Sequence, residues 1–255
     1  SGAKNAVLPI MTAALMGDGT SVITRVPDLR DTRTMIRLME IVGAGCSYDK
    51  GRLEIDASTV HNPEAPYDMV KTMRASFYIL GPLLARFGKV KVSLPGGCAW
   101  GPRPVDFHLK GLEKLGAKIT LESGYIIAEA KRLQGAEISF EFPSVGATGN
   151  IAMAAATAKG TTIIKNAARE PEIVQLCDYL NSMGANITGI GTTRISIDGV
   201  DENYEYIRFP MNFLRLEKSI KTLLSTSTNL DFVVICLVMS CLNFNFLKQH
   251  EEWCK

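Results

Sequence analysis

Apolar positions along the first part of the chain switch between helical and strand-like spacing. Small and apolar residues fill 6–15, and the β-branched stretch 19–23 follows them. Next, apolar residues recur every three or four positions up to a glycine, the usual helix stop, at Met35, Leu38, Met39, Val42 and Gly43. This order of helix, strand and helix is typical of an α/β domain.

The same pattern returns twice further along the chain. Gly19 has a counterpart in Gly160 and Gly43 has one in Gly184, each 141 residues later. A middle copy begins at Gly88, and a hairpin around Gly124 is predicted to close it, with strands at 118–121 and 125–128. The first helix of the second and third copies is expected at 76–86 and 151–158. A generic α/β domain with similar joints is the alternative, but two equal offsets without gaps favour a repeat.

The repeat and its end define the expected domain organisation. Three units, at about 1–60, 68–130 and 143–200, share one plan and predict one domain over 1–200. Residues 201–255 depart from it: 201–221 is charged and mixed, and 232–247 is an apolar run. That run is shorter than the roughly 20 residues that a membrane span needs. A buried helix or a misread end of the gene is therefore favoured over a membrane anchor.

Composition and charge narrow the function classes. The 255 residues are 46% hydrophobic and 21% charged with a net charge of +2, so nothing favours nucleic-acid binding. No P-loop, dinucleotide-binding or Ser/His/Asp pattern occurs, and no cofactor is expected. The six cysteines have neither metal-site nor disulfide-framework spacing: Cys46, Cys98, Cys177, Cys236, Cys241 and Cys254.

The start of the sequence bears on the location of the protein and on its length. Residues 1–5 have no secretion-signal pattern, and with these cysteines a reducing cytoplasm is expected. The sequence does not begin with Met, which favours a start inside a longer protein.

Cys98 is the residue most indicative of chemistry. Three glycines and three prolines surround it, so a loop that exposes the thiol is expected. Arg103 follows five residues later, and a guanidinium stabilises a thiolate and binds phosphate through paired hydrogen bonds. Lys4 and Asn5 precede the first predicted helix, whose N-terminal amides and neighbouring ammonium suit a phosphate. A plain surface turn and a solvated, capped helix end are the alternatives.

Five motifs, in this order and spacing, carry a resemblance to a known family. They are SGAKNA at 1–6, KTMRAS at 71–76, GGCAWGPRPVD at 96–106, SVGAT at 144–148 and AREPE at 168–172. The chain resembles the enolpyruvyl transferases from residue 1 to about 199, in the branch that acts on UDP-N-acetylglucosamine for peptidoglycan precursor synthesis. This resemblance implies an inside-out α/β barrel of three βαβαββ-like repeats, one of the family's two domains, with a divergent C-terminal tail.

The resemblance also implies residue roles. Cys98 would donate a proton to phosphoenolpyruvate, with Lys4 and Arg103 stabilising the phosphate. Lys4 and Asn5 would contact both substrates, and Arg74, expected on one helical face with Lys71, would contact the diphosphate. The uridine pocket would be formed by Arg103, Pro104, Val105, Asp106, Phe107, Phe142, Pro143, Ser144 and Val145.

Two other hypotheses stay open beside this one. The family's base, an aspartate of the other domain, has no counterpart here, nor do its C-terminal phosphate-binding arginines. The chain would then be a truncated, catalytically incompetent ligand-binding or interaction domain. An enolpyruvyl transferase acting on shikimate 3-phosphate is disfavoured by the Cys98 loop and by the Lys4–Asn5 pair.

Overall fold

The computed structural model describes residues 2–71, 73–94 and 105–199. All of them belong to the first of two compact units, Ser1–Phe209; the second is Pro210–Lys255. Cys98, Arg103, Pro104 and the predicted tail at 201–255 lie outside the described residues.

The first repeat consists of two helices and a three-stranded sheet. Its elements are α1 (Lys4–Ala14), β1 (Thr20–Ile23), α2 (Arg30–Ile41), β2 (Gly45–Asp49) and β3 (Arg52–Asp56). Strand β3 lies in the middle and pairs antiparallel with both neighbours. Leu53 and Ile55 alternate with more exposed residues along β3, so one face of the sheet is buried.

The second repeat has the same plan with additions. It contains β4 (Glu64–Ala65), α3 (Tyr67–Val70), the 3₁₀ helix η1 (Arg74–Ile79), α4 (Leu80–Phe87), β5 (Lys89–Ser93), α5 (Asp106–Lys114), β6 (Lys118–Glu122) and β7 (Tyr125–Glu129). The predicted hairpin is confirmed: β6 and β7 pair around Ser123 and Gly124, both with positive φ.

The third repeat completes the domain. It contains β8 (Glu137–Ser139), α6 (Val145–Ala155), β9 (Thr161–Lys165), α7 (Pro171–Ser182), β10 (Asn186–Thr188) and β11 (Arg194–Asp198). The last strand of each repeat, β3, β7 or β11, lies between its hairpin partner, β2, β6 or β10, and the strand β1, β5 or β9. In the second and third repeats, β4 and β8 add a parallel strand at the edge.

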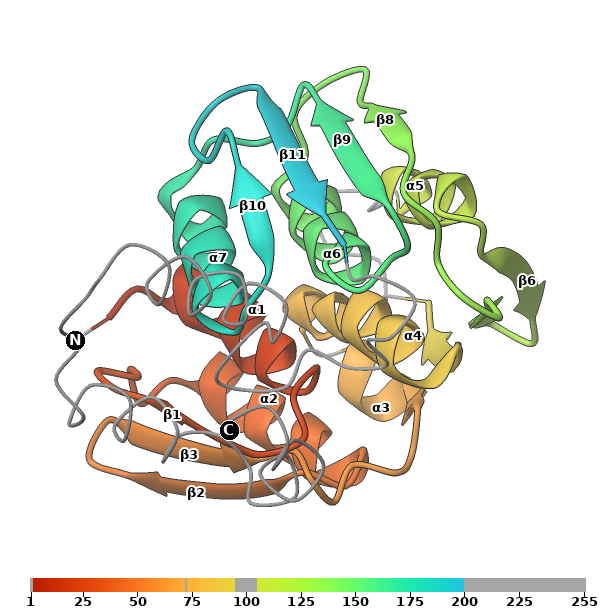
Figure 1. The fold of residues 1–255 in the computed structure, drawn as a ribbon. Helices are drawn as coiled ribbons and strands as arrows, with labels where there is room; N and C mark the ends of the chain where they lie inside the picture. The colour runs from red at the N-terminus through yellow and green to blue at the C-terminus, as the bar shows by residue number, and fades with distance from the viewer. Residues whose placement is uncertain (1, 72, 95–104, 200–255) are drawn as a thin grey trace, which may run out of the picture. The chain divides into compact units, whose positions relative to one another are not determined.

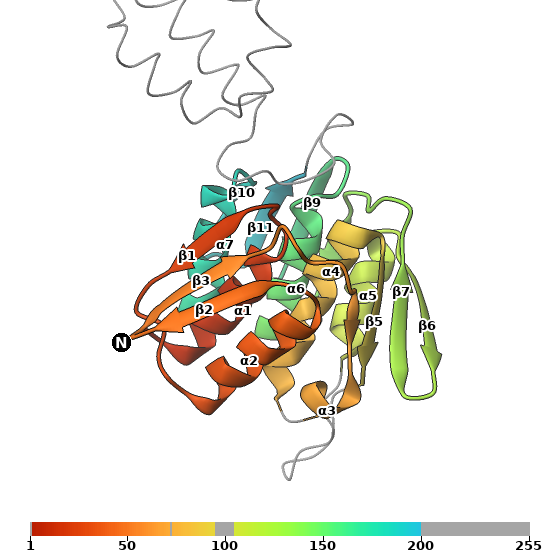
Figure 2. The ribbon, with the colours of Figure 1, turned by 90° about the horizontal axis from the view of Figure 1, so that it is seen from below.

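The helices pack together and the three sheets lie outside them (Figures 1 and 2). The α/β inside-out fold is therefore as predicted. Helix α6 is buried from Ala147 to Ala155, and α1 is buried over most of its length. Thr12 of α1 donates to the sulfur of Met153 of α6 at 3.7 Å, and the two residues are again 141 positions apart. Equivalent residues of two repeats thus meet in the core.

The glycine offsets have a structural basis. Gly43 follows α2 with a φ of +100°, and Gly184 follows α7 with a φ of +101°. L-residues with a side chain rarely adopt that conformation, so glycine is required at both helix ends. Gly19 and Gly160 both directly precede a strand, although only Gly160 has a positive φ.

One predicted helix is broken in the structure. The stretch expected as a single helix at 76–86 consists of η1 and then α4, because the side chain of Asn150 inserts between them. Its Oδ1 accepts from Gly81 N at 2.8 Å, and its Nδ2 donates to Phe77 O at 3.0 Å. These are the donor and acceptor that an i to i−4 bond of a continuous helix would join.

The prediction that Lys71 and Arg74 share one helical face is wrong, because the chain is not one continuous helix between them. Lys71 directly follows the last residue of α3, Met73 is extended, and Arg74 begins η1. Lys71 instead pairs with Asp68 at 2.6 Å.

Within the described part of the chain, every helix is too short or too polar to span a bilayer. The apolar run at 232–247 lies outside the described residues.

The contact between α4 and α6 generates a stability prediction. A β-carbon on Gly81 would lie 2.4 Å from the backbone oxygen of Asn150. We expect Gly81→Ala to lower the free energy of unfolding by about 1–3 kcal/mol, as overpacking does. Gly19→Ala is the matched control, because nothing lies within 4 Å of its β-carbon and its φ is not positive. Urea unfolding measures both variants, and equal stability would contradict the packing described here.

Candidate functional site

Three helices begin with residues that the sequence singled out. Lys4 is the first residue of α1, Asp106 of α5 and Val145 of α6. Helix α1 has no side-chain cap, and Lys4 and Asn5 are exposed beside its first turn. Free backbone N–H groups and the helix dipole favour an anion at such an end. These features are compatible with a phosphate at the start of α1, and the site itself stays a prediction.

Lys4 has a partner that the sequence did not reveal. Its Nζ lies 2.9 Å from Oδ2 of Asp31, in the first turn of α2, and both side chains are partly exposed. An ion pair of this exposure contributes little to stability, about 0–1 kcal/mol. It does hold the long lysine side chain at the start of α1, where a phosphate would need it.

Two of the residues predicted to line the uridine pocket, Phe107 and Phe142, form an aromatic cluster with Phe140. The Phe107 ring lies 4.7 Å from the Phe142 ring, edge to face, and 5.6 Å from the Phe140 ring. Phe140 is buried, whereas Phe142 is 58% exposed. Edge-to-face pairs of this kind are favourable beyond the area they bury. The cluster thus offers an exposed aromatic surface on a fixed base.

The first turn of α6 forms the neighbouring wall. The hydroxyl of Ser144 accepts from Ala147 N at 3.3 Å and so caps the helix. Pro143 is exposed and Val145 is half-buried. Val145 packs against the core, which fixes where this turn lies.

Val105 and Asp106 open α5 in the same region. Val105 precedes the helix and also packs against the core, and Asp106 is exposed in the first turn. A carboxylate in the first turn of a helix is stabilised by the dipole, and here it remains free to accept from a ligand.

Arg74 is exposed at the start of η1, and its charge acts on the partly buried ring of Tyr78 and on the buried ring of His108. Burial raises the pKa of Tyr78, with Glu172 adding to the rise and Arg74 opposing it. Burial, and to a smaller extent the positive charge of Arg74, lower the pKa of His108 to about 3. His108 is therefore neutral at physiological pH and lies within the field of Arg74.

The structure thus brings together part of the predicted set. Phe107 and Phe142 are in contact, Arg74 is close to His108 of α5, and α1 packs on η1. Lys4 is tied to Asp31, and no described contact joins it to the aromatic cluster. Among the described residues, no three His, Cys, Asp or Glu side chains gather as a metal site would require.

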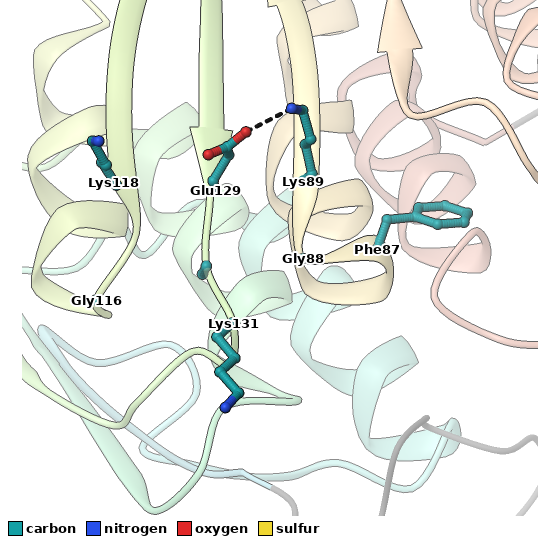
Figure 3. A pocket seen from close by; sticks show the side chains of 8 residues that line it. Phe87, Gly88, Lys89, Gly116, Lys118, Glu129 and Lys131 are labelled. Atoms are coloured by element: carbon teal, nitrogen blue, oxygen red, sulfur yellow. Dashed lines mark ion pairs between the residues drawn. The ribbon is translucent and has the colours of Figure 1, made fainter.

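A hollow of about 570 Å³ lies elsewhere, and Figure 3 shows its lysines. It is lined by Phe87, Gly88, Lys89, Gly116, Lys118, Glu129, Ala130 and Lys131. Gly88 and Gly116 follow the C-terminal ends of α4 and α5, whereas Asp106 begins α5. Helix C-termini carry partial negative charge, and Glu129 already pairs with Lys89 at 2.6 Å. This hollow contains none of the predicted site residues.

Comparison with known proteins agrees with the fold and motifs, which define an enolpyruvyl transferase domain. The family described as EPSP synthase (3-phosphoshikimate 1-carboxyvinyltransferase) matches residues 1–209. The enolpyruvyl transferase NikO from Streptomyces tendae superposes with a TM-score of 0.72 at 23% identity, over 83% of this chain and 49% of that one. EPSP synthase from Acinetobacter baumannii gives 0.61 at 20% identity, over 78% and 46%. The chain belongs to the EPSP synthase family.

Closer sequence relatives are named more narrowly. UDP-N-acetylglucosamine 1-carboxyvinyltransferase from Chlorobaculum parvum is 56% identical over 220 residues, which are 85% of this chain and 52% of the relative. The protein of the same name from Chloroherpeton thalassium is 59% identical over 207 residues, which are 80% of this chain and 48% of that protein. The chain thus spans about half the length of these curated relatives.

The thiols give a prediction about Cys98, which lies outside the described residues. Cys177 is buried and Cys46 is partly buried, and burial raises the pKa of each to about 12. Because the thiolate is the reactive form, both should alkylate slowly. We expect Cys98 to be labelled first of the six thiols under brief, substoichiometric alkylation, read by peptide mass mapping. Cys98→Ser is the control, and preferential labelling of Cys46 or Cys177 would contradict the prediction.

Proposed function

We propose that this chain supplies one domain of a transferase that moves the enolpyruvyl group of phosphoenolpyruvate to the 3′-hydroxyl of UDP-N-acetylglucosamine. The observation that carries the proposal is the 56% identity over 220 residues to a relative of that name. The reaction would open peptidoglycan precursor synthesis, and with it cell-wall formation, cell shape and cell division.

The proposed reaction needs a general acid and a site that binds the phosphate anion. The sugar hydroxyl adds to C2 of phosphoenolpyruvate and loses its proton to a base, while an acid protonates C3. The C2–O bond to the phosphate then breaks and a proton leaves C3, which restores the C2=C3 double bond of the enolpyruvyl group. Cys98 is the proposed acid and could also trap the enolpyruvyl group covalently. Lys4 and Arg103 would stabilise the phosphate charge. The exposed Lys4 and Asn5 at the start of α1 support this assignment for the phosphate side.

The sugar nucleotide is proposed to lie along the starts of α5 and α6. Phe107 and Phe142 offer an apolar face for a base, and Asp106 can accept from a base N–H. Pro143, Ser144 and Val145 would form the other wall, and Arg103, Pro104 and Val105 are proposed to line the same pocket. Arg74 would meet the diphosphate, since it is exposed close to this region. The proposed partners are these two small substrates.

The cytoplasm is the proposed location of this reaction. Cys46 and Cys177 are free thiols, and the spacing of the six cysteines gives no disulfide framework, as expected in a reducing compartment.

Turnover by the 255-residue chain alone should be slight. The resemblance assigns the general base and the facing wall to the other domain, and acid–base catalysis contributes about 10²–10⁴ in rate. Without the facing wall, Lys4 and Arg103 would act through water, where each charge contact is weak. We expect weak binding of UDP-N-acetylglucosamine and little phosphate release from phosphoenolpyruvate in its presence.

A phosphate-release assay with both substrates measures this, with Cys98→Ala as the control for contaminating phosphatase. Release at several turnovers per second that disappears in Cys98→Ala would contradict the prediction. It would show that the site is complete within this chain or between two copies of it.

A further inference from the structure

His108 is buried at the joint between α5 and α6 and has no role in the proposed chemistry so far. It is 5% exposed, and its ring lies 5.0 Å from Phe77 in an edge-to-face contact. Its Nδ1 lies 2.9 Å from Nδ2 of Asn150. On the opposite edge, a β-carbon on Gly146 would lie 3.1 Å from Nε2 and Cε1. The ring therefore fills the space between three elements.

The bonds of Asn150 determine where the proton of His108 resides. The Asn150 Oδ1 accepts from Gly81 N, so the other end of the amide must be the NH₂ group. That group donates to Phe77 O and to the ring, and Nδ1 of His108 must then be an acceptor. The imidazole is neutral with its proton on Nε2. If the Asn150 amide were flipped, its NH₂ group would face the N–H of Gly81, and two donors would meet with no acceptor between them.

The ring controls the spacing of two proposed pocket walls. His108 follows Phe107 directly in α5, and its Nε2 edge rests on Gly146 in the first turn of α6. Phe107 in turn contacts Phe142, which precedes that turn. A change in the position of the imidazole would therefore shift the α5 wall relative to the α6 wall.

Burial and the nearby charge of Arg74 keep the ring neutral. Arg74 of η1 is the charged group that acts on it, and Asp106 and Lys110 of its own helix are exposed. Helix α6 has no titratable side chain, and Glu137 of β8 is paired with Lys165. Lys118 and Glu122 of β6 are exposed. Burial and Arg74 together hold the pKa of His108 near 3, so its charge does not change between pH 8 and 5.

We infer that His108 is a positioning residue for the sugar nucleotide: a neutral imidazole, held by Asn150, that sets the distance between the α5 and α6 walls of its pocket. This inference rests on the proposed function. It assigns no contact with the reacting atoms to His108.

Nitrogen NMR of the whole chain, with UDP-N-acetylglucosamine titrated in, tests the inference. We expect the Nε2–H tautomer of His108 at every pH from 8 to 5. The affinity should be constant over that range, because this diphosphate diester has no titrating phosphate there. A histidine of ordinary pKa, 6.5, would become a cation as the pH falls, and the affinity for the dianion would rise.

Two variants separate positioning from folding. His108→Gln can still accept from Asn150 and should bind UDP-N-acetylglucosamine nearly as wild type does. His108→Leu leaves the Asn150 donor unsatisfied and should bind about tenfold more weakly. Thermal unfolding checks that both variants fold, and the exposed His61→Gln is the control.

The outcomes distinguish the two proposals. If wild type shows the Nε2–H tautomer but no binding of UDP-N-acetylglucosamine, the proposed function fails and the role of His108 fails with it. If wild type binds but shows the Nδ1–H tautomer, or if folded His108→Leu binds equally well, the positioning role alone is overturned. Failure of both variants to fold leaves the tautomer and the pH profile of wild type as the deciding results.

Discussion

The arrangement of the inner helices depends on one buried amide. Asn150 of α6 replaces the backbone bond that would join Gly81 to Phe77, and it thereby fixes where η1 ends and α4 begins. An unpaired polar group here would cost about 1–3 kcal/mol, so the amide is either fully bonded or strongly destabilising. Gly81 permits the contact because any side chain would collide with the Asn150 backbone. Two helices from different repeats therefore approach each other closely at this point.

The same amide connects the fold to the proposed pocket. Its third bond reaches His108, whose ring separates α5 from the first turn of α6. Arg86 forms a comparable tie between the second and first repeats, donating to the carbonyl oxygens of Leu15 and Gly17 beyond the end of α1. Polar side chains thus fix the relative positions of helices whose small apolar residues would allow several packings. The candidate site lies where these fixed helices begin.

Much of the fold could be predicted from the sequence, since glycine stops and β-branched strands are local signals. Gly43 and Gly184 are examples, with a backbone conformation that glycine alone adopts easily. The break before Gly81 could not be predicted, because the residue that causes it lies 69 positions away. The Lys4–Asp31 pair was missed for a similar reason. The resemblance supplied the candidate site residues, and geometry alone would have indicated only the aromatic cluster and the helix starts.

Hydrogen exchange of the Asn150 side chain tests the central claim most directly. If both Nδ2 protons are bonded in the core, they should exchange only when the whole domain unfolds, at the same free energy as the Gly81 amide. The side-chain amide of Asn62, which is less buried and bonded to Ile41 O at 3.3 Å, is the internal reference. Exchange of the Asn150 protons as fast as those of Asn62 would contradict the account, because the helices would then be held together in some other way.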